Sequence, residues 1–156
     1  MALAEIDIDG IAQALHRAAV DATPAWVSRS VLLVAGMQSV DTGDAGVLIT
    51  DAGDRARVFV DDRLGTLLNA DIDRQRSTPL SVFRDAARFP VEVLHQLGAQ
   101  PVQRVDVERW ASPNDPFGVT PATLADVGEA VQEAGIMWGA AKAAIHLQRR
   151  RDEGQR

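Results

Sequence analysis

The fold is decided by a pattern that is clearest in RSTPLSVFRDAARFPVEVLHQLG, residues 76–98, where Thr78-Pro79 stands directly before a run of apolar residues at helical spacing. A threonine hydroxyl can cap the first backbone N–H groups of a helix, and proline is favoured at the first helical position. Thr-Pro also precedes an apolar run at Thr23-Pro24 and at Thr120-Pro121. We therefore expect a helix to begin at each of these three dipeptides.

The helix after Thr78 should have one apolar and one polar side. Pro90 interrupts the pattern, and because proline removes a backbone hydrogen bond and clashes with the preceding turn, we expect a kink or two short helices there. Gly98 is the natural stop signal. The predicted inward face consists of Leu80, Phe83, Ala87, Val91 and Leu94.

The N-terminal part predicts two helices, residues 9–21 and residues 24–38, the first capped by Asp9 and the second begun by Thr23-Pro24. Residues 41–46, DTGDAG, predict a loop by composition. The inward face of the second helix should be formed by Trp26, Val27, Ser30, Val31, Leu33, Val34 and Met37.

Residues 47–60 allow two interpretations. The β-branched runs on either side of DAGD could form a short β-hairpin. Alternatively, Asp51 caps a helix whose apolar residues recur at three- and four-residue spacing. We prefer the helix, because the same spacing continues past the hairpin to Leu68.

The remaining chain predicts a long proline-containing loop over residues 99–119, with Trp110 and Phe117 as its anchors to the core. A short helix should follow at residues 121–127, and a mostly buried helix at about 128–150. The expected fold is therefore mainly α, a single helical domain over residues 1–150 with five or six helices, followed by a frayed tail at 151–156.

Composition restricts the function. The chain has 156 residues and a net charge of −6, which makes nucleic acid an unlikely partner. It contains no cysteine, which excludes disulfides and thiolate chemistry. The acidic N-terminus does not resemble a secretory signal, and no apolar run approaches the roughly 20 residues that span a bilayer. We therefore expect a cytoplasmic protein without a membrane partner.

Sequence motifs give no catalytic assignment. The chain has no phosphate-binding glycine loop, no zinc-protease motif and no nucleophile elbow, and its three histidines lie far apart in the sequence. We therefore expect neither a cofactor nor a metal.

One candidate site lies on the last predicted helix. Trp138, Lys142 and His146 recur every four residues beside Gly135 and Gly139, so they could line a cleft in which a desolvated lysine acts as a base or nucleophile. The plainer interpretation, which we prefer, is a surface lysine whose aliphatic stem covers the indole.

A second candidate is the loop WASPNDPF, residues 110–117. Asn114 and Asp115 precede or follow prolines that favour fixed turns, and Trp110 and Phe117 could hold the loop as a recognition surface. Anchoring of the loop alone explains the aromatic residues equally well.

The third candidate is a basic face on the helix after Thr78, where Arg84, Arg88 and His95 could meet an anion. Asp85 and Glu92 stand among them, and mixed charges at helical spacing are typical of a solvated, ion-paired surface. We prefer that second interpretation.

These observations favour a non-catalytic helical interaction or regulatory protein that binds a protein partner or associates with itself. The alternative is a small-ligand-binding protein or enzyme whose cleft lies near Lys142, His146 and residues 110–117.

Overall fold

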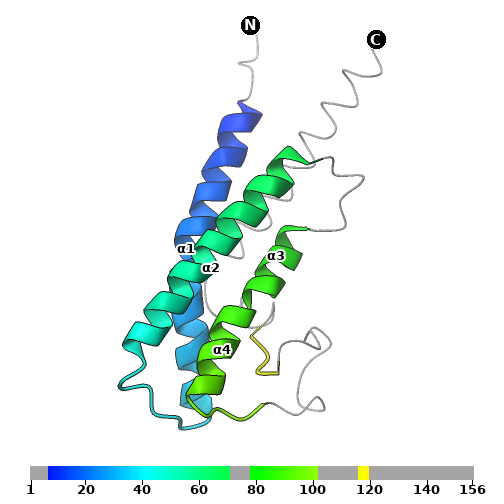
Figure 1. Ribbon diagram of the computed structural model, residues 1–156. Helices are drawn as coiled ribbons and strands as arrows, with labels where there is room; N and C mark the ends of the chain where they lie inside the picture. The colour runs from blue at the N-terminus through cyan, green and yellow to red at the C-terminus, as the bar shows by residue number, and fades with distance from the viewer. Residues whose placement is uncertain (1–6, 71–77, 102–115, 120–156) are drawn as a thin grey trace, which may run out of the picture.

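The computed structural model describes residues 7–70, 78–101 and 116–119, and this part of the chain is mainly helical, without a strand (Figure 1). Its first two helices, α1 (Ile8–Met37) and α2 (Gly46–Asn69), run antiparallel and pack along their length. The mainly α fold is thus confirmed for the described residues. The predicted helices at 121–127 and 128–150 and the tail at 151–156 lie outside them.

Two shorter helices complete the described part. α3 (Pro79–Ala86) and α4 (Arg88–Gln96) follow one another and pack against α2, and α4 also contacts α1 (Figure 1). The chain therefore runs along α1, returns along α2, and passes down again through α3 and α4.

The helix start at Thr78 is confirmed. The Thr78 side chain accepts a hydrogen bond from the backbone N–H of Ser81 at 3.2 Å, and the Ser81 hydroxyl accepts one from the backbone N–H of Thr78 at 2.8 Å. Pro79 occupies the first turn. The two side chains thus satisfy backbone donors reciprocally, as a capping box does.

The predicted division into two short helices is confirmed, but the helices meet at Ala87 and not at Pro90, which lies in the first turn of α4. α4 ends at Gln96, and the predicted stop signal, Gly98, follows in the left-handed region with φ of +79°. The N–H of Gly98 donates to His95 O and that of Ala99 to Leu94 O, the pair of bonds of a Schellman motif. Phe83, Ala87, Val91 and Leu94 of the predicted inward face are buried.

The predicted helix start at Thr23-Pro24 is wrong, because α1 continues through Pro24. Thr23 is fully buried, and its hydroxyl donates to the carbonyl of Ala19, one turn earlier, at 2.9 Å. A threonine that bonds backwards to the preceding turn belongs to an existing helix and does not cap a new one. The predicted helices at 9–21 and 24–38 are therefore one helix.

The predicted cap at Asp9 is also wrong. The N-cap is Asp7, whose Oδ1 accepts a hydrogen bond from the backbone N–H of Gly10 at 2.8 Å, while Asp9 lies in the first turn. Both acids have the residue type that a cap and a first turn favour, so the position of the cap could not be deduced from residue type alone.

The far end of α1 is closed by a second Schellman motif. Val40 N–H donates to Ala35 O at 2.9 Å and Ser39 N–H to Gly36 O at 3.2 Å. Ser39 occupies the left-handed position with φ of 54°. The predicted loop over residues 41–46 follows, with Gly43 N–H bonded to the Asp41 side chain at 2.9 Å, and α2 begins at its last residue, Gly46.

Residues 47–60 are helical, so the hairpin alternative is wrong and the helix interpretation is confirmed. The helix nevertheless begins at Gly46 and not at Asp51, with Ala45 at the N-cap position and no side-chain cap. Asp51 instead accepts a hydrogen bond from Arg55 one turn later. The residues of α2 that are buried are Ile49, Ala52, Gly53, Ala56, Val60, Leu64 and Leu67.

α1 and α2 pack closely where Pro24 meets Gly53. A Cβ on Gly53 would lie 3.2 Å from Pro24 Cα and 3.3 Å from Pro24 Cβ. The absence of a side chain at residue 53 therefore allows the two helices to approach where the proline ring projects. The surrounding core includes Trp26, Val27 and Val31 of α1, all buried.

Candidate functional site

The residues predicted to form a cleft lie outside the described part of the chain, so their convergence stays a prediction. From the loop 99–119 the structure describes both ends, including Phe117, which is buried as expected of an anchor. The predicted contacts that lie outside the described residues are Trp110, Asn114, Asp115, Trp138, Lys142 and His146.

The basic face of α3 and α4 is described, and it divides into two parts. The ring of His95 packs edge-on against Phe117, with centroids 4.8 Å apart. Arg88 instead lies over two rings, its Cζ 4.6 Å from the Phe59 centroid and 4.7 Å from the Phe89 centroid. Arg88 and His95 therefore make different contacts and do not form one anion site.

The acids that stand among these basic residues pair with arginines of α2. Arg55 Nη1 lies 3.2 Å from Glu92 Oε2, and Arg63 Nη2 lies 3.8 Å from Asp85 Oδ2. The preferred interpretation of an ion-paired face is thus confirmed, but the pairs join neighbouring helices and not residues of one helix. Exposed pairs of this kind contribute at most about 1 kcal/mol each.

Arg55 is the most connected of these cations. Its Nε donates to Asp51 Oδ2 at 2.9 Å, and its Cζ lies 5.4 Å from the Phe89 ring centroid. The hydrogen bond to Asp51, followed by that to Glu92, raises the pKa of Arg55 above its ordinary value. Since a raised pKa favours the charged form, Arg55 remains a cation over the whole physiological pH range.

Phe59 and Phe89 form the centre of this surface, with ring centroids 5.8 Å apart in an edge-to-face arrangement. The contact between Phe59 and Arg88 joins residues of two different helices and was not predicted from the sequence. One signal was available in the sequence: Phe59 and Arg63 stand four residues apart, which places the cation on the same side of the helix as the ring. The Cζ of Arg63 indeed lies 5.7 Å from the Phe59 centroid.

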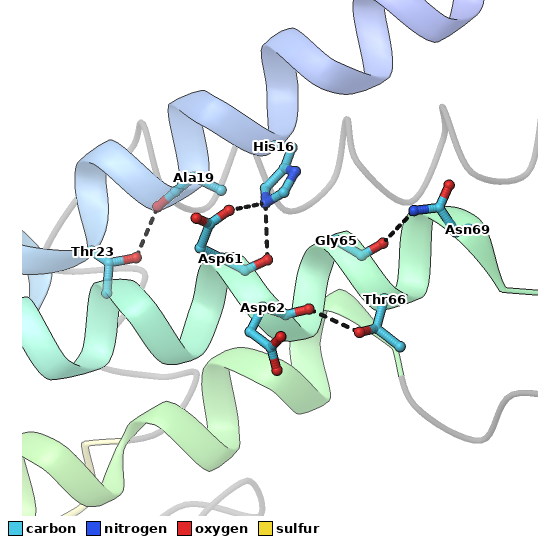
Figure 2. Close-up of polar contacts among 8 residues, drawn as sticks. All are labelled: His16, Ala19, Thr23, Asp61, Asp62, Gly65, Thr66 and Asn69. Atoms are coloured by element: carbon cyan, nitrogen blue, oxygen red, sulfur yellow. Dashed lines mark hydrogen bonds and ion pairs between the residues drawn. The ribbon is translucent and has the colours of Figure 1, made fainter.

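A polar contact joins the N-terminal half of α1 to the C-terminal half of α2 (Figure 2). His16 Nε2 lies 2.8 Å from Asp61 Oδ1 and 3.1 Å from the backbone O of Asp61. Both neighbours are oxygens, so we infer that Nε2 carries a proton and donates. No short motif links residues 16 and 61, so this pair could not be predicted from the sequence.

The same view shows polar side chains that bond within α2 and do not form a site. Thr66 Oγ1 donates to the backbone O of Asp62 at 2.9 Å, and Asn69 Nδ2 donates to Gly65 O at 3.0 Å (Figure 2). These bonds reach back one turn along their own helix. They stabilise side-chain positions near the end of α2. Of the contacts drawn in Figure 2, only that between His16 and Asp61 joins two helices.

Two buried polar atoms of α1, Trp26 Nε1 and Ser30 Oγ, have no hydrogen-bond partner among the described residues. They lie one helical turn apart, on the side of α1 that the sequence predicted to face inward. A buried polar atom without a partner costs about 1–3 kcal/mol relative to its hydrated state. This pair is therefore a local weakness of the α1 core.

Large apolar side chains are exposed at one end of the described part. Of the seven such residues among the described ranges, five lie between residues 32 and 48, where α1 ends and α2 begins. Met37 is 79% exposed and Val47 is 81% exposed. We call these five residues the apolar end: Leu32, Leu33, Met37, Val47 and Leu48.

Several classes of site are not found in the described ranges. Histidine and acidic side chains do not gather there in groups of three that could hold a metal ion. None of the helices described combines the length and apolar character needed to cross a bilayer. Comparison of the chain with protein-family models, with curated proteins and with solved structures found no match. The function must therefore be inferred from the side chains themselves.

Proposed function

We propose that this chain is a non-catalytic, cytoplasmic helical interaction protein that contacts another protein chain, which includes a second copy of itself, through the apolar end. The observation that carries the proposal is the concentration of exposed apolar side chains between residues 32 and 48. Single exposed apolar residues are ordinary on protein surfaces, but a local group of them is typical of contact sites.

Burial of the apolar end against a partner would contribute favourable free energy to binding. Leu33 and Met37 are one turn apart on α1, and Val47 is at the beginning of α2 after a short loop. Fully burying one such side chain is favourable by about 1.5–3 kcal/mol. The loop and helix ends around them are closed by hydrogen bonds, so little ordering should be needed when a partner binds.

The test compares a double variant, Met37→Gln with Val47→Gln, with the single variant Val58→Gln. Val58 is 66% exposed but lies in the middle of α2, away from the apolar end. Light scattering over a range of concentrations measures self-association, and affinity capture followed by mass spectrometry identifies a different partner.

We expect association with a second copy or with a reproducible partner in the wild type and in the Val58 variant, and its loss in the double variant. A strictly monomeric wild type that retains no partner would contradict the proposal. Equal association of the double variant and the wild type would contradict it as well.

The alternative function, a ligand or substrate cleft near Lys142, His146 and residues 110–117, has no support from the described contacts, because these residues lie outside the described ranges apart from the end of the loop. It stays a separate prediction from the sequence.

A further inference from the structure

We propose that Arg88 binds an acidic side chain of a partner protein on a surface formed by α2 and α4. This inference shares with the proposed function only the premise that the partner is a protein. It concerns a different surface from the apolar end, so either proposal can fail alone.

Three acidic side chains on this surface are paired with arginines of α2. Asp51 and Glu92 are bonded to Arg55, and Asp85 lies within ion-pair distance of Arg63. Arg88 makes no ion pair with a carboxylate of the described residues, and its contacts there are with the two rings. Asp85 and Glu92, the acidic residues nearest to Arg88 in the sequence, thus form ion pairs with arginines of α2 and not with Arg88.

The Arg88 guanidinium is held in place by two aromatic rings. Its Cζ lies 4.6 Å from the Phe59 centroid and 4.7 Å from the Phe89 centroid, and among the described residues no hydrogen bond uses its N–H donors. The side chain is held by both rings while its donors remain available to a carboxylate. Less side-chain entropy is then lost when the carboxylate binds.

The charge of Arg88 favours an acidic side chain as its partner. One guanidinium outside an ion pair fits a single carboxylate, whereas a nucleic-acid backbone needs several cations, and the chain as a whole carries −6. Charges farther than a screening length of about 10 Å at 0.1 M salt contribute little, so the overall negative charge does not prevent this local contact.

The experiment titrates the full chain with N-acetyl hexaglutamate amide and observes the Arg88 Nε–Hε resonance by NMR. Hexaglutamine and a single-stranded oligonucleotide of six nucleotides are the comparison probes. The variants are Arg88→Gln and, as the control for loss of one positive charge, Arg57→Gln, which alters an exposed arginine of α2. Circular dichroism establishes that each variant is folded.

We expect hexaglutamate to shift the Arg88 resonance, and its affinity to fall roughly fivefold in Arg88→Gln but to change much less in Arg57→Gln. Equal losses in both variants, no shift of the Arg88 resonance, or stronger binding of the oligonucleotide would each overturn the inference. If Arg88→Gln is not folded, the wild-type titration alone tests the inference: a shift of the Arg88 resonance supports it, and no shift overturns it. Association through the apolar end, measured separately, would be untouched by any of these results.

Discussion

The side-chain amide of Gln38 pairs in both directions with the backbone of Gln100. Its Nε2 donates to the carbonyl of Gln100 at 2.8 Å, and its Oε1 accepts from the N–H of Gln100 at 2.7 Å. Gln38 follows the last residue of α1, and Gln100 follows the turn that ends α4. The amide therefore joins the C-terminal ends of two helices that are far apart in the sequence.

Replacing Gln38 with alanine should lower the free energy of unfolding by about 1–2 kcal/mol, because two hydrogen bonds at a half-buried position are lost. Urea denaturation measures the change. The matched control is Gln13→Ala, at an exposed position within α1, which should change stability by less than about 0.5 kcal/mol. Equal effects of the two substitutions would show that the pair with Gln100 contributes nothing.

Ser39 and Gly98 should respond oppositely to substitution. Both occupy the left-handed position of a Schellman motif, with φ of 54° and +79°. Ser39→Gly should raise the free energy of unfolding by about 0.5–1 kcal/mol by relieving the backbone, and Gly98→Ala should lower it by about 1 kcal/mol. Thermal and urea unfolding check both values. A destabilised Ser39→Gly variant would argue against the left-handed turn at the end of α1.

Gly53 and Gly36 offer the same substitution in two environments. A Cβ on Gly53 would meet the backbone of Pro24, whereas a Cβ on Gly36 would meet nothing within 4 Å. We expect Gly53→Ala to destabilise by about 1–2 kcal/mol through overpacking, despite the better helix propensity of alanine. Gly36→Ala should stabilise by up to about 1 kcal/mol. If both variants were stabilised, α1 and α2 would not approach closely at Pro24.

Ser30 should be replaceable with a gain in stability. Its hydroxyl is buried and has no hydrogen-bond partner within the described ranges, so Ser30→Ala removes an unsatisfied polar atom and introduces a good helix former. The free energy of unfolding should rise by about 1 kcal/mol. Thr23→Ala is the comparison, because the buried Thr23 hydroxyl does have a partner, and this change should be destabilising. A destabilised Ser30→Ala variant would mean that the hydroxyl is satisfied in solution.

How much could be predicted from the sequence depended on whether the signal was local. The start at Thr78 and the stop at Gly98 were predictable because cap and turn geometry is determined by a few neighbouring residues. The same Thr-Pro dipeptide failed at residue 23, because there the threonine is buried within a longer helix and the proline ring packs against Gly53. Tertiary packing, which a dipeptide does not encode, decided between the two outcomes.

The surface contacts were less predictable than the helices. The helical spacing of α2 correctly rejected the hairpin, yet it could not show that Arg55 and Arg63 take their acids from other helices. Nor could periodicity indicate that Leu33 and Met37, placed on the inward stripe with Trp26, are exposed at the end of α1. That part of the stripe extends beyond the buried core, so the expectation for these two residues was wrong.

The most direct test of the central claim places a photo-reactive benzoylphenylalanine at Met37 or, as the control, at Val58. After irradiation in an extract of the cells that make the protein, we predict a covalent protein adduct from position 37, with either a second copy or a reproducible partner, and little or none from position 58. No adduct at position 37, or equal adducts from both positions, would contradict the assignment of residues 32–48 as the contact surface.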